Sequence, residues 1–154
     1  MTVSVIIPMY NAEGYIERCF VSLQKQTFSD YELIFVDDAS TDNTLCILQS
    51  LLVSDISINN KSKVISLPHN GGSSNARRKG MNEAQGDYII QVDSDDYVDP
   101  EYLAFLMRKA EDTNADVVVC DFYYAGATIR QKHLRLPEDH DSCLSAIIRG
   151  TIHN

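Results

Sequence analysis

Short apolar runs alternate along the chain with longer segments whose apolar residues recur at helical spacing. The short runs are rich in β-branched and aromatic residues, which is typical of buried strands, and the longer segments are typical of amphipathic helices. Because strands that alternate with helices form parallel sheets, the pattern predicts an α/β fold with a mainly parallel sheet and helices on both faces. Expected strands are 3–7, 31–36, 63–67, 87–92 and 116–120, and expected helices are 15–26, 44–52 behind a cap at 40–43, 73–84 and 100–110.

Proline, glycine and polar residues predict where these elements end. Pro8 lacks a backbone N–H and is expected to stop the first strand, and Gly86 is expected to stop the helix before it. The polar segment 54–62 predicts a surface loop. Beyond residue 124 the pattern weakens to an expected edge strand within 127–136 and a short helix around 143–148, and the chain then ends without a convincing final element.

The bulk composition predicts a soluble cytoplasmic domain. The 154 residues suit one domain with a substantial core, and no run approaches the roughly 18 apolar residues of a membrane-spanning helix. The net charge of -9 argues against a nucleic-acid binder, which would present a basic face. Residues 1–10 carry no basic residue, so no signal peptide is expected. Widely spaced cysteines predict free, buried thiols in a reducing compartment: Cys19, Cys46, Cys120 and Cys143.

The acidic loop, residues 93–99, follows the expected strand 87–92 and precedes an expected helix. Its carboxylates therefore lie at the carboxyl end of a strand, where open α/β sheets bind ligands. Packing like charges so closely costs free energy unless a cation lies among them, and oxygen ligands suit Mg²⁺ or Mn²⁺. A calcium loop of the EF-hand type is excluded, because Val98 and Ala104 stand where it needs glycine and glutamate. A solvated acidic turn in which Asp99 caps the helix remains the alternative.

Two further loops are expected at the same edge of the sheet. In the first, Tyr10 offers a ring that can stack on a base, and Asn11 offers groups that can hydrogen-bond one, the alternative being plain turn chemistry. In the second, the carboxylates of Asp37 and Asp38 can accept hydrogen bonds from a base or a ribose. The alternative there is an extension of the helix cap at Ser40.

A third loop joins glycines to basic residues. The glycines beginning at Gly71 let the backbone approach a ligand, the start of the following helix favours anions, and Arg77, Arg78 and Lys79 supply positive charge. The alternative is a glycine turn with solvated basic residues. The segment matches no phosphate-binding loop of the nicotinamide or ATP type. Together, the four loops hold the parts needed to bind a nucleoside diphosphate with a divalent cation.

The motifs on these loops resemble those of the family 2 glycosyltransferases, which have the GT-A fold. The resemblance runs in order from about residue 2 to residue 124 and rests on VSVIIPMYN at 3–11, QTF at 26–28, ELIFVDDASTD at 32–42, NGGSSNAR at 70–77 and DSDD at 93–96. It implies an enzyme that transfers a sugar from a nucleotide-sugar with inversion. It also implies a nucleotide-sugar-binding group of residues: Pro8, Tyr10, Asn11, Asp38, Arg77, Asp93, Ser94 and Asp95.

Within that group, the resemblance implies separate tasks. Pro8, Tyr10 and Asp38 would contact the base, and Arg77 would lie near the diphosphate or sugar. Asp95 would bind Mn²⁺ or Mg²⁺, with Asp93 beside it near the ribose or sugar. The donor implied is a UDP-sugar, because UDP dominates the family.

The resemblance also implies the other partners. The acceptor would be a saccharide or a lipid-linked saccharide in cell-surface polysaccharide synthesis, and the protein would be cytoplasmic, with peripheral association at the inner face of the membrane left open. The catalytic base normally lies beyond the acidic loop and is not identified, since Asp139 and Asp141 match no family motif. We therefore expect residues 1–124 to form the donor-binding portion and 125–154 to begin an incomplete acceptor-side region. The oligomeric state is left open.

Three rival interpretations follow from the same residues. The first is a nucleotide-sugar-binding module that is catalytically incomplete, whether truncated or regulatory. The second is a sugar-phosphate nucleotidyltransferase, but its glycine-rich first loop is replaced here by residues 8–11. The third is a response-regulator receiver, but that fold needs its acidic pair after the first strand, and Asp37 and Asp38 follow the second expected strand.

Overall fold

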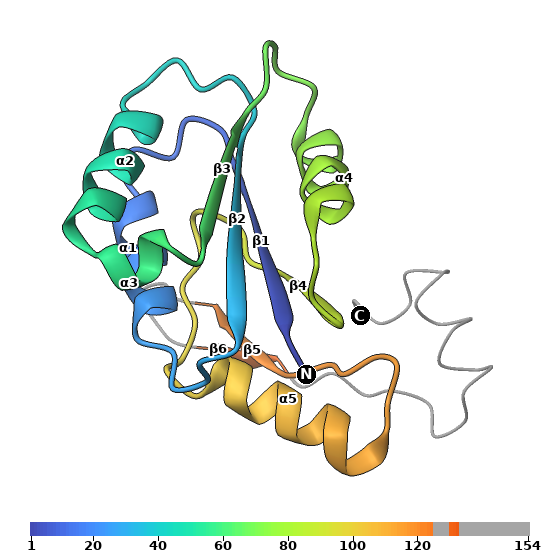
Figure 1. The fold of residues 1–154 in the computed structure, drawn as a ribbon. Helices are drawn as coiled ribbons and strands as arrows, with labels where there is room; N and C mark the ends of the chain where they lie inside the picture. Colours follow the sequence, from blue (N-terminus) through green and yellow to red (C-terminus); the bar gives the residue numbers. More distant parts are fainter. Residues whose placement is uncertain (125–129, 133–154) are drawn as a thin grey trace. The chain divides into compact units, whose positions relative to one another are not determined.

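The structure is a computed structural model that describes residues 1–124 and 130–132. Contacts divide the chain into two units, Met1–Met107 and Arg108–Asn154. The elements, drawn in Figure 1, are β1 (Val3–Met9), α1 (Ile16–Gln24), β2 (Tyr31–Asp37), α2 (Thr44–Ser54), α3 (Ile56–Asn59), β3 (Ser62–Ser66), α4 (Ser73–Glu83), β4 (Tyr88–Gln91), α5 (Tyr102–Thr113), β5 (Phe122–Tyr124) and β6 (Arg130–Lys132).

The first unit is built on a four-stranded sheet in the order β3-β2-β1-β4. Every pairing in it is parallel, and Val3 stands opposite Tyr31 on one side and Tyr88 on the other. Helices connect the strands, as parallel pairing requires. The expected α/β fold with a mainly parallel sheet is confirmed.

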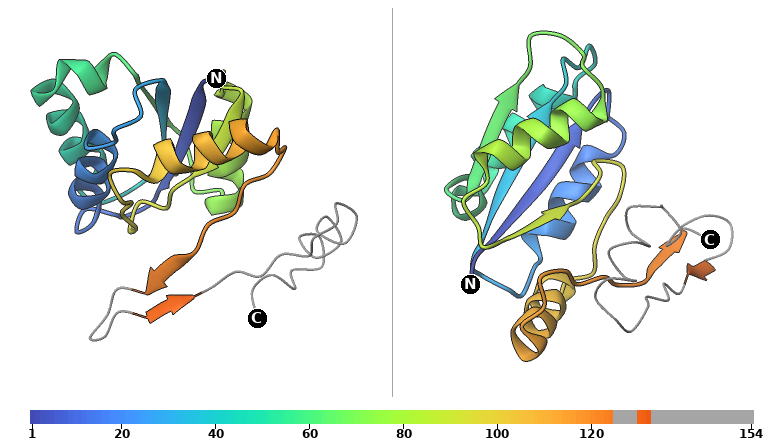
Figure 2. Two further views of the ribbon diagram at one scale, coloured as in Figure 1. Left: turned by 90° about the horizontal axis from the view of Figure 1, so that it is seen from below. Right: turned by 90° about the vertical axis from the view of Figure 1, so that its right-hand side faces the viewer.

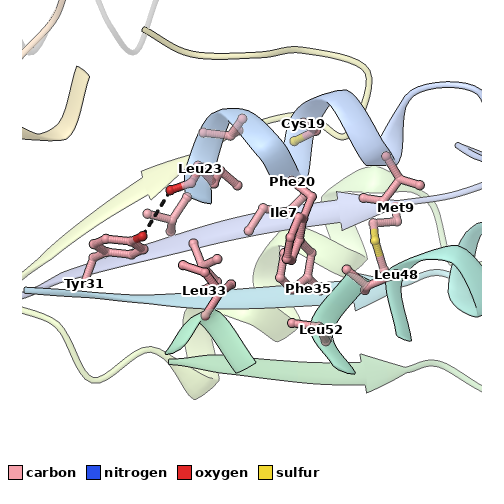
Figure 3. Packing of buried hydrophobic residues seen from close by; sticks show 14 of the residues in the cluster. Ile7, Met9, Cys19, Phe20, Leu23, Tyr31, Leu33, Phe35, Leu48 and Leu52 are labelled. Carbon is pink, nitrogen blue, oxygen red and sulfur yellow. Dashed lines mark hydrogen bonds between the residues drawn. The ribbon is translucent and has the colours of Figure 1, made fainter. Parts of the chain in front are cut away.

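Alternate residues of the central strands pack against helices on opposite faces. On one face, Ile7 and Phe35 belong to a core shared with α1, where Phe20 stacks on Phe35 with ring centroids 6.3 Å apart (Figure 3). On the other face, Ile34 and Val36 pack against Ala76 of α4, which Figure 2 shows lying across the strands. The alternation explains why these strands are continuously apolar, because both faces are covered.

Pro8 lies within β1, so the expectation that it stops the strand is wrong. In a parallel sheet, the main-chain groups of successive residues face opposite neighbours. The Met9 carbonyl accepts a hydrogen bond from Asp38 on the β2 side. The Ile6 carbonyl accepts one from Val92 on the β4 side. The nitrogen of Pro8 therefore faces the β4 side beyond the last residue of that strand, where no N–H is needed.

Two other expectations about the ends of elements are also corrected. The expected loop 54–62 contains the helical turn α3, which Asp55 caps by accepting the N–H of Ile58 at 3.1 Å. The expected strand 116–120 is wrong, because those residues lie outside any strand and the strand β5 begins only after them. The apolar Val117 is 54% exposed, so apolar composition alone misplaced this strand.

In the second unit, β5 and β6 form an antiparallel pair with Phe122 opposite Lys132. The strand β6 falls within the edge strand expected at 127–136. The rest of that range, the helix expected around 143–148, and Asp139, Asp141 and Cys143 lie outside the described residues. Across the described part of the chain, no helix combines the length and apolar character needed to cross a membrane.

Gly86 does not stop α4, because the helix already ends at Glu83 with Ala84 as its C-cap. Gly86 instead passes close to β1. A Cβ added to it would lie 2.6 Å from the nitrogen of Ser4 and 2.9 Å from the carbonyl carbon of Val3. Its N–H donates to the Ser4 hydroxyl at 2.8 Å. Only glycine allows this approach of backbone to backbone.

Replacing Gly86 with alanine is therefore expected to destabilise the fold. The added methyl meets main-chain atoms that cannot move aside, and such overpacking costs about 2 kcal/mol of unfolding free energy. Urea unfolding followed by circular dichroism measures the change. Gly14→Ala is the matched control, because nothing lies within 4 Å of its added Cβ. Equal stability of the two variants would contradict the close-approach explanation.

Candidate functional site

A cavity of about 440 Å³ opens at the carboxyl edge of the sheet, where Figure 1 shows the loops after β1, β2 and β3 side by side. We call it the edge cavity. Its volume is in the range of small-molecule sites. Every residue that the sequence assigns to nucleotide-sugar binding lies on its wall, together with several that it does not. The lining residues are Pro8, Met9, Tyr10, Asn11, Ala12, Tyr15, Asp38, Asn70, Gly72, Ser73, Ala76, Arg77, Asp93, Ser94 and Asp95.

Two tyrosines contribute aromatic surface to the edge cavity. Tyr10 follows β1 and is 50% exposed, and Tyr15 precedes α1 and is 52% exposed. Large exposed aromatic side chains beside a cavity offer faces on which a planar ligand can stack. Helical periodicity places Tyr15 at the start of a helix but does not show that a residue before the first turn lines a cavity.

Asn11 fastens two loops together. Its N–H donates to the hydroxyl of Ser40 at 3.0 Å, and its side-chain oxygen accepts the N–H of Thr41 at 2.8 Å. Asn11 adopts a left-handed backbone conformation with φ of 49°, which asparagine tolerates better than most residues. The loop after β1 is thus bound to the loop after β2. These two hydrogen bonds fix the position of the backbone next to Tyr10.

A second set of bonds joins the same loops nearer to α2. The Asp42 carboxylate accepts the N–H of Thr44 at 3.0 Å with one oxygen and the N–H of Glu13 at 3.0 Å with the other. The Glu13 carboxylate in turn accepts from the backbone and side-chain nitrogens of Asn43. Within the polar run 40–43, Asp42 therefore binds the first N–H of α2, whereas Asn43, the N-cap residue, makes no side-chain capping bond. The run also binds the neighbouring loop.

Asp38 is buried, and both of its carboxylate oxygens are bound by main-chain N–H groups. One oxygen accepts from Gly71 at 2.9 Å and the other from Gly72 at 2.7 Å. Asp38 therefore joins the end of β2 to the start of α4. Its neighbour Asp37, not Asp38, lies near the N–H of Ser40, at 3.4 Å. Since each oxygen keeps a second lone pair, Asp38 can still accept from a ligand in the edge cavity.

Arg77 is the basic residue on the cavity wall. It forms a 2.6 Å ion pair with Asp93 and donates to the hydroxyl of Ser73 at 3.1 Å. The two other cations expected to help bind an anion have different partners. Arg78 donates to the Asn75 side chain, and Lys79 pairs with a glutamate one turn along α4. The expected basic cluster is thus reduced to one guanidinium that faces the acidic loop.

The acidic loop brings three carboxylates together. Oxygens of Asp93, Asp95 and Asp96 lie within 4.8 Å of one another. Partial burial, together with the charges of Asp95 and Asp93, raises the pKa of Asp96. Hard oxygen donors of this kind could hold Mg²⁺ or Mn²⁺, and Asp96 joins the two carboxylates that the sequence assigns to the metal. Asp99, the expected cap residue, accepts the N–H of Glu101 at 2.9 Å, directly before α5 begins.

Cys19 lies beneath the acidic loop and is buried on α1 (Figure 3). Burial, followed by the negative charges of Asp96 and its neighbours, raises the pKa of its thiol to about 12. The thiol therefore stays protonated and donates to the carbonyl of Asp93 at 3.7 Å. Cys19 is the buried thiol expected from the sequence, whereas Cys46 is exposed, which corrects that expectation for α2.

Comparison with known proteins identifies the family. Residues 4–150 match the sequence profile described as Glycosyl transferase family 2. The chain belongs to this family. It is 43% identical over 121 residues to the uncharacterized glycosyltransferase EpsJ of Bacillus subtilis (strain 168), covering 79% of this chain and 34% of EpsJ. It is 36% identical over 121 residues to the glycosyltransferase GlyG of Streptococcus pneumoniae serotype 4, covering 79% of this chain and 39% of GlyG.

The family 2 assignment extends to the fold. The crystal structure of residues 1–349 of Staphylococcus aureus TarS in complex with UDP superposes with a TM-score of 0.68 at 36% identity, covering 75% of this chain and 34% of that TarS chain. The GT-A fold is therefore confirmed for this family 2 chain, and the nucleotidyltransferase and receiver interpretations are excluded. The chain spans well under half the length of these relatives.

The buried carboxylate of Asp38 provides a test of how the edge cavity is held. Asp38→Asn replaces one acceptor with an NH₂ group that faces a main-chain N–H, so we expect a loss of about 2 kcal/mol in unfolding free energy. We also expect faster hydrogen exchange at the amides of Gly71 and Gly72, measured by NMR. Asp37→Asn, whose contacts are longer, should leave both amides protected. Unchanged exchange in Asp38→Asn would contradict the role assigned to the carboxylate.

Proposed function

We propose that this chain is the donor-binding portion of a glycosyltransferase that moves a sugar, with inversion, from a UDP-sugar to a saccharide or lipid-linked saccharide. One observation carries the proposal: a single edge cavity contains exposed aromatic rings, a buried carboxylate, a guanidinium and a carboxylate cluster. These groups match the base, the diphosphate and the cation of a bound nucleotide-sugar. The similarity to TarS, solved with UDP and with UDP-GlcNAc, supports the choice of donor.

Base recognition is assigned to the side of the edge cavity formed by β1 and β2. Tyr10 stacks on the base, and Pro8 forms the floor beside it. Asp38 accepts a hydrogen bond from a base N–H with the lone pairs that Gly71 and Gly72 leave open. Asn11 keeps Tyr10 in place through its bond to the neighbouring loop. The protein thus holds the base with groups whose positions are already fixed by hydrogen bonds.

Diphosphate binding is assigned to the opposite side. Arg77 donates to phosphate oxygens, because a guanidinium binds such oxygens with two parallel N–H groups. Asp95, with Asp93 and Asp96, would hold Mn²⁺ or Mg²⁺. When bound, the cation neutralises the charge that develops on the leaving diphosphate. Ser94 lies between these carboxylates on the cavity wall and contributes to the sugar side of the site.

The acceptor half is assigned to residues from 125 onward, while 1–124 form the donor half. Transfer also needs a carboxylate that takes the proton from the acceptor hydroxyl as it attacks. Synthesis of a cell-surface polysaccharide is the setting we propose, because TarS is named as a poly(ribitol-phosphate) β-N-acetylglucosaminyltransferase. A binding module without transfer activity is the competing outcome, and activity measurements on the whole protein separate the two.

Calorimetric titration with UDP, GDP and ADP, each with and without Mn²⁺, tests the donor site directly. We expect UDP to bind most tightly and to bind more tightly with Mn²⁺ present. Asp95→Asn should remove the Mn²⁺ effect while the fold remains intact, because the residue is exposed on a loop. Asp30→Asn makes the same change in charge at an exposed position far along the chain from the acidic loop. Metal-dependent binding retained in Asp95→Asn would show that the metal assignment is wrong.

Arg77 separates the diphosphate from the nucleoside. Arg77→Gln is expected to weaken UDP binding about tenfold or more, because a charge-assisted hydrogen bond contributes roughly 1.5–3 kcal/mol. The affinity for uridine, which lacks the diphosphate, should change little. Titrating both ligands into the parent and the variant gives the comparison. Arg78→Gln is the matched control, because its side chain binds Asn75. An equal loss for uridine and UDP would place Arg77 elsewhere in the site.

A further inference from the structure

The acidic loop is held from one side by α1 and the residues directly after it. Four side chains, at positions 18, 19, 22 and 26, share one face of the helix and its extension because of their spacing. Each of them hydrogen-bonds a main-chain atom of the acidic loop. Three of the side chains donate to carbonyls of the loop: Arg18 to Asp95 at 2.6 Å, Cys19 to Asp93 at 3.7 Å, and Gln26 to Asp99 at 2.7 Å. The fourth, Ser22, accepts the N–H of Val98 at 3.2 Å.

The contacts continue beyond the acidic loop. The side-chain oxygen of Gln26 accepts the N–H of Leu103 at 3.0 Å, and the N–H of Thr27 donates to the carbonyl of Pro100 at 2.9 Å. The backbone from 93 to 103 is therefore hydrogen-bonded at successive residues to α1 and to the segment directly after it. Loops without secondary structure are otherwise the more mobile parts of a fold.

Arg18 contacts the acidic loop in two ways, through a hydrogen bond to its main chain and through a ring contact with one of its side chains. Besides donating to the Asp95 carbonyl, its guanidinium lies 4.7 Å from the centre of the Tyr97 ring. Arg18 therefore contacts the residue before Asp96 and the residue after it. The planar guanidinium suits this double task, because it can stack on a ring while its N–H groups donate in the plane.

We propose that α1 is the positioning element of the metal site and that Arg18 is its principal positioning residue. By binding the main-chain carbonyl of Asp95 and the side-chain ring of Tyr97, on either side of Asp96, Arg18 directs the carboxylates of Asp95 and Asp96 toward a common point. Arg18 binds no metal itself. This inference rests on the proposed function, since it concerns the same carboxylates.

A simpler role for Arg18 makes the opposite prediction. If Arg18 only offset the negative charge of the cluster, removing it would strengthen the binding of a divalent cation, because a repelling charge would be gone. If Arg18 positions the carboxylates, removing it weakens cation binding despite the lost repulsion. The sign of the change therefore separates the two roles.

The test measures the dissociation constant of Mn²⁺ in the presence of saturating UDP by electron paramagnetic resonance. For Arg18→Met we expect about tenfold weaker Mn²⁺ binding, as for residues that orient metal ligands, with unchanged metal-free affinity for uridine. Arg18→Lys keeps the charge but lacks the planar group, so we expect an intermediate loss. Lys25→Met removes an equal charge at an exposed position directly after α1, and should bind Mn²⁺ like the parent.

A second variant and a second readout complete the test. Ser22→Ala changes no charge but removes the acceptor of the Val98 N–H, so we expect weaker Mn²⁺ binding and faster amide exchange at Val98. Arg18→Met should likewise speed exchange across the acidic loop. Unchanged exchange, or tighter Mn²⁺ binding in Arg18→Met, would overturn the positioning role. A parent chain that binds neither UDP nor Mn²⁺ would instead overturn the proposed function, while the exchange data would still decide whether α1 holds the loop.

Discussion

Parallel pairing of β1 with β2 on one side and β4 on the other is the constraint on which the rest of the structure depends. Because the strands run in one direction, the segments that follow them must all emerge at the same edge of the sheet. Residues that are distant in sequence, such as Tyr10, Asp38 and Asp93, therefore meet around one cavity. The buried faces of the strands supply the stability, and the loops are left to carry the chemistry.

Charge at this edge is arranged in opposed pairs. The acidic loop concentrates carboxylates, yet Arg77 contacts Asp93 from α4 and Arg18 contacts the Asp95 carbonyl from α1. The buried carboxylate of Asp38 is stabilised differently, by two main-chain N–H groups. The acidic loop thus has two cationic neighbours, while the buried carboxylate of Asp38 is stabilised by main-chain dipoles. This division matches the cost of each environment, because a buried charge needs direct hydrogen bonds more than an exposed one.

Much of the fold could be predicted from the sequence, because the spacing of hydrophobic residues indicates which elements are strands and which are helices. Much of the cavity wall could be predicted as well, because the carboxyl ends of parallel strands lie at the same edge of a sheet. What failed depends on neighbours that a pattern does not show. Pro8 does not end β1, because its nitrogen points toward the β4 side beyond the last residue of that strand, which the sequence around Pro8 does not show. The bond from the Thr41 N–H to the side-chain oxygen of Asn11, thirty positions away, likewise has no signal in the sequence. The contacts of Arg18 had no signal in the sequence, since any exposed helical position can carry arginine.

The hydrogen bonds from α1 and the residues directly after it end on main-chain atoms of the acidic loop, and the side chain that Arg18 also contacts is Tyr97, not one of the carboxylates. This separates the shape of the loop from the chemistry of its carboxylates. Carbonyl and N–H groups are present whatever residue occupies a position, so a substitution at Asp95 or Asp96 leaves the anchoring atoms unchanged. The metal-ligating residues of such a loop can be substituted one at a time while the backbone conformation is retained. The same arrangement makes the acidic loop a suitable scaffold for engineering, in which substituted side chains change the preferred ion while the hydrogen bonds to α1 keep the loop conformation unchanged.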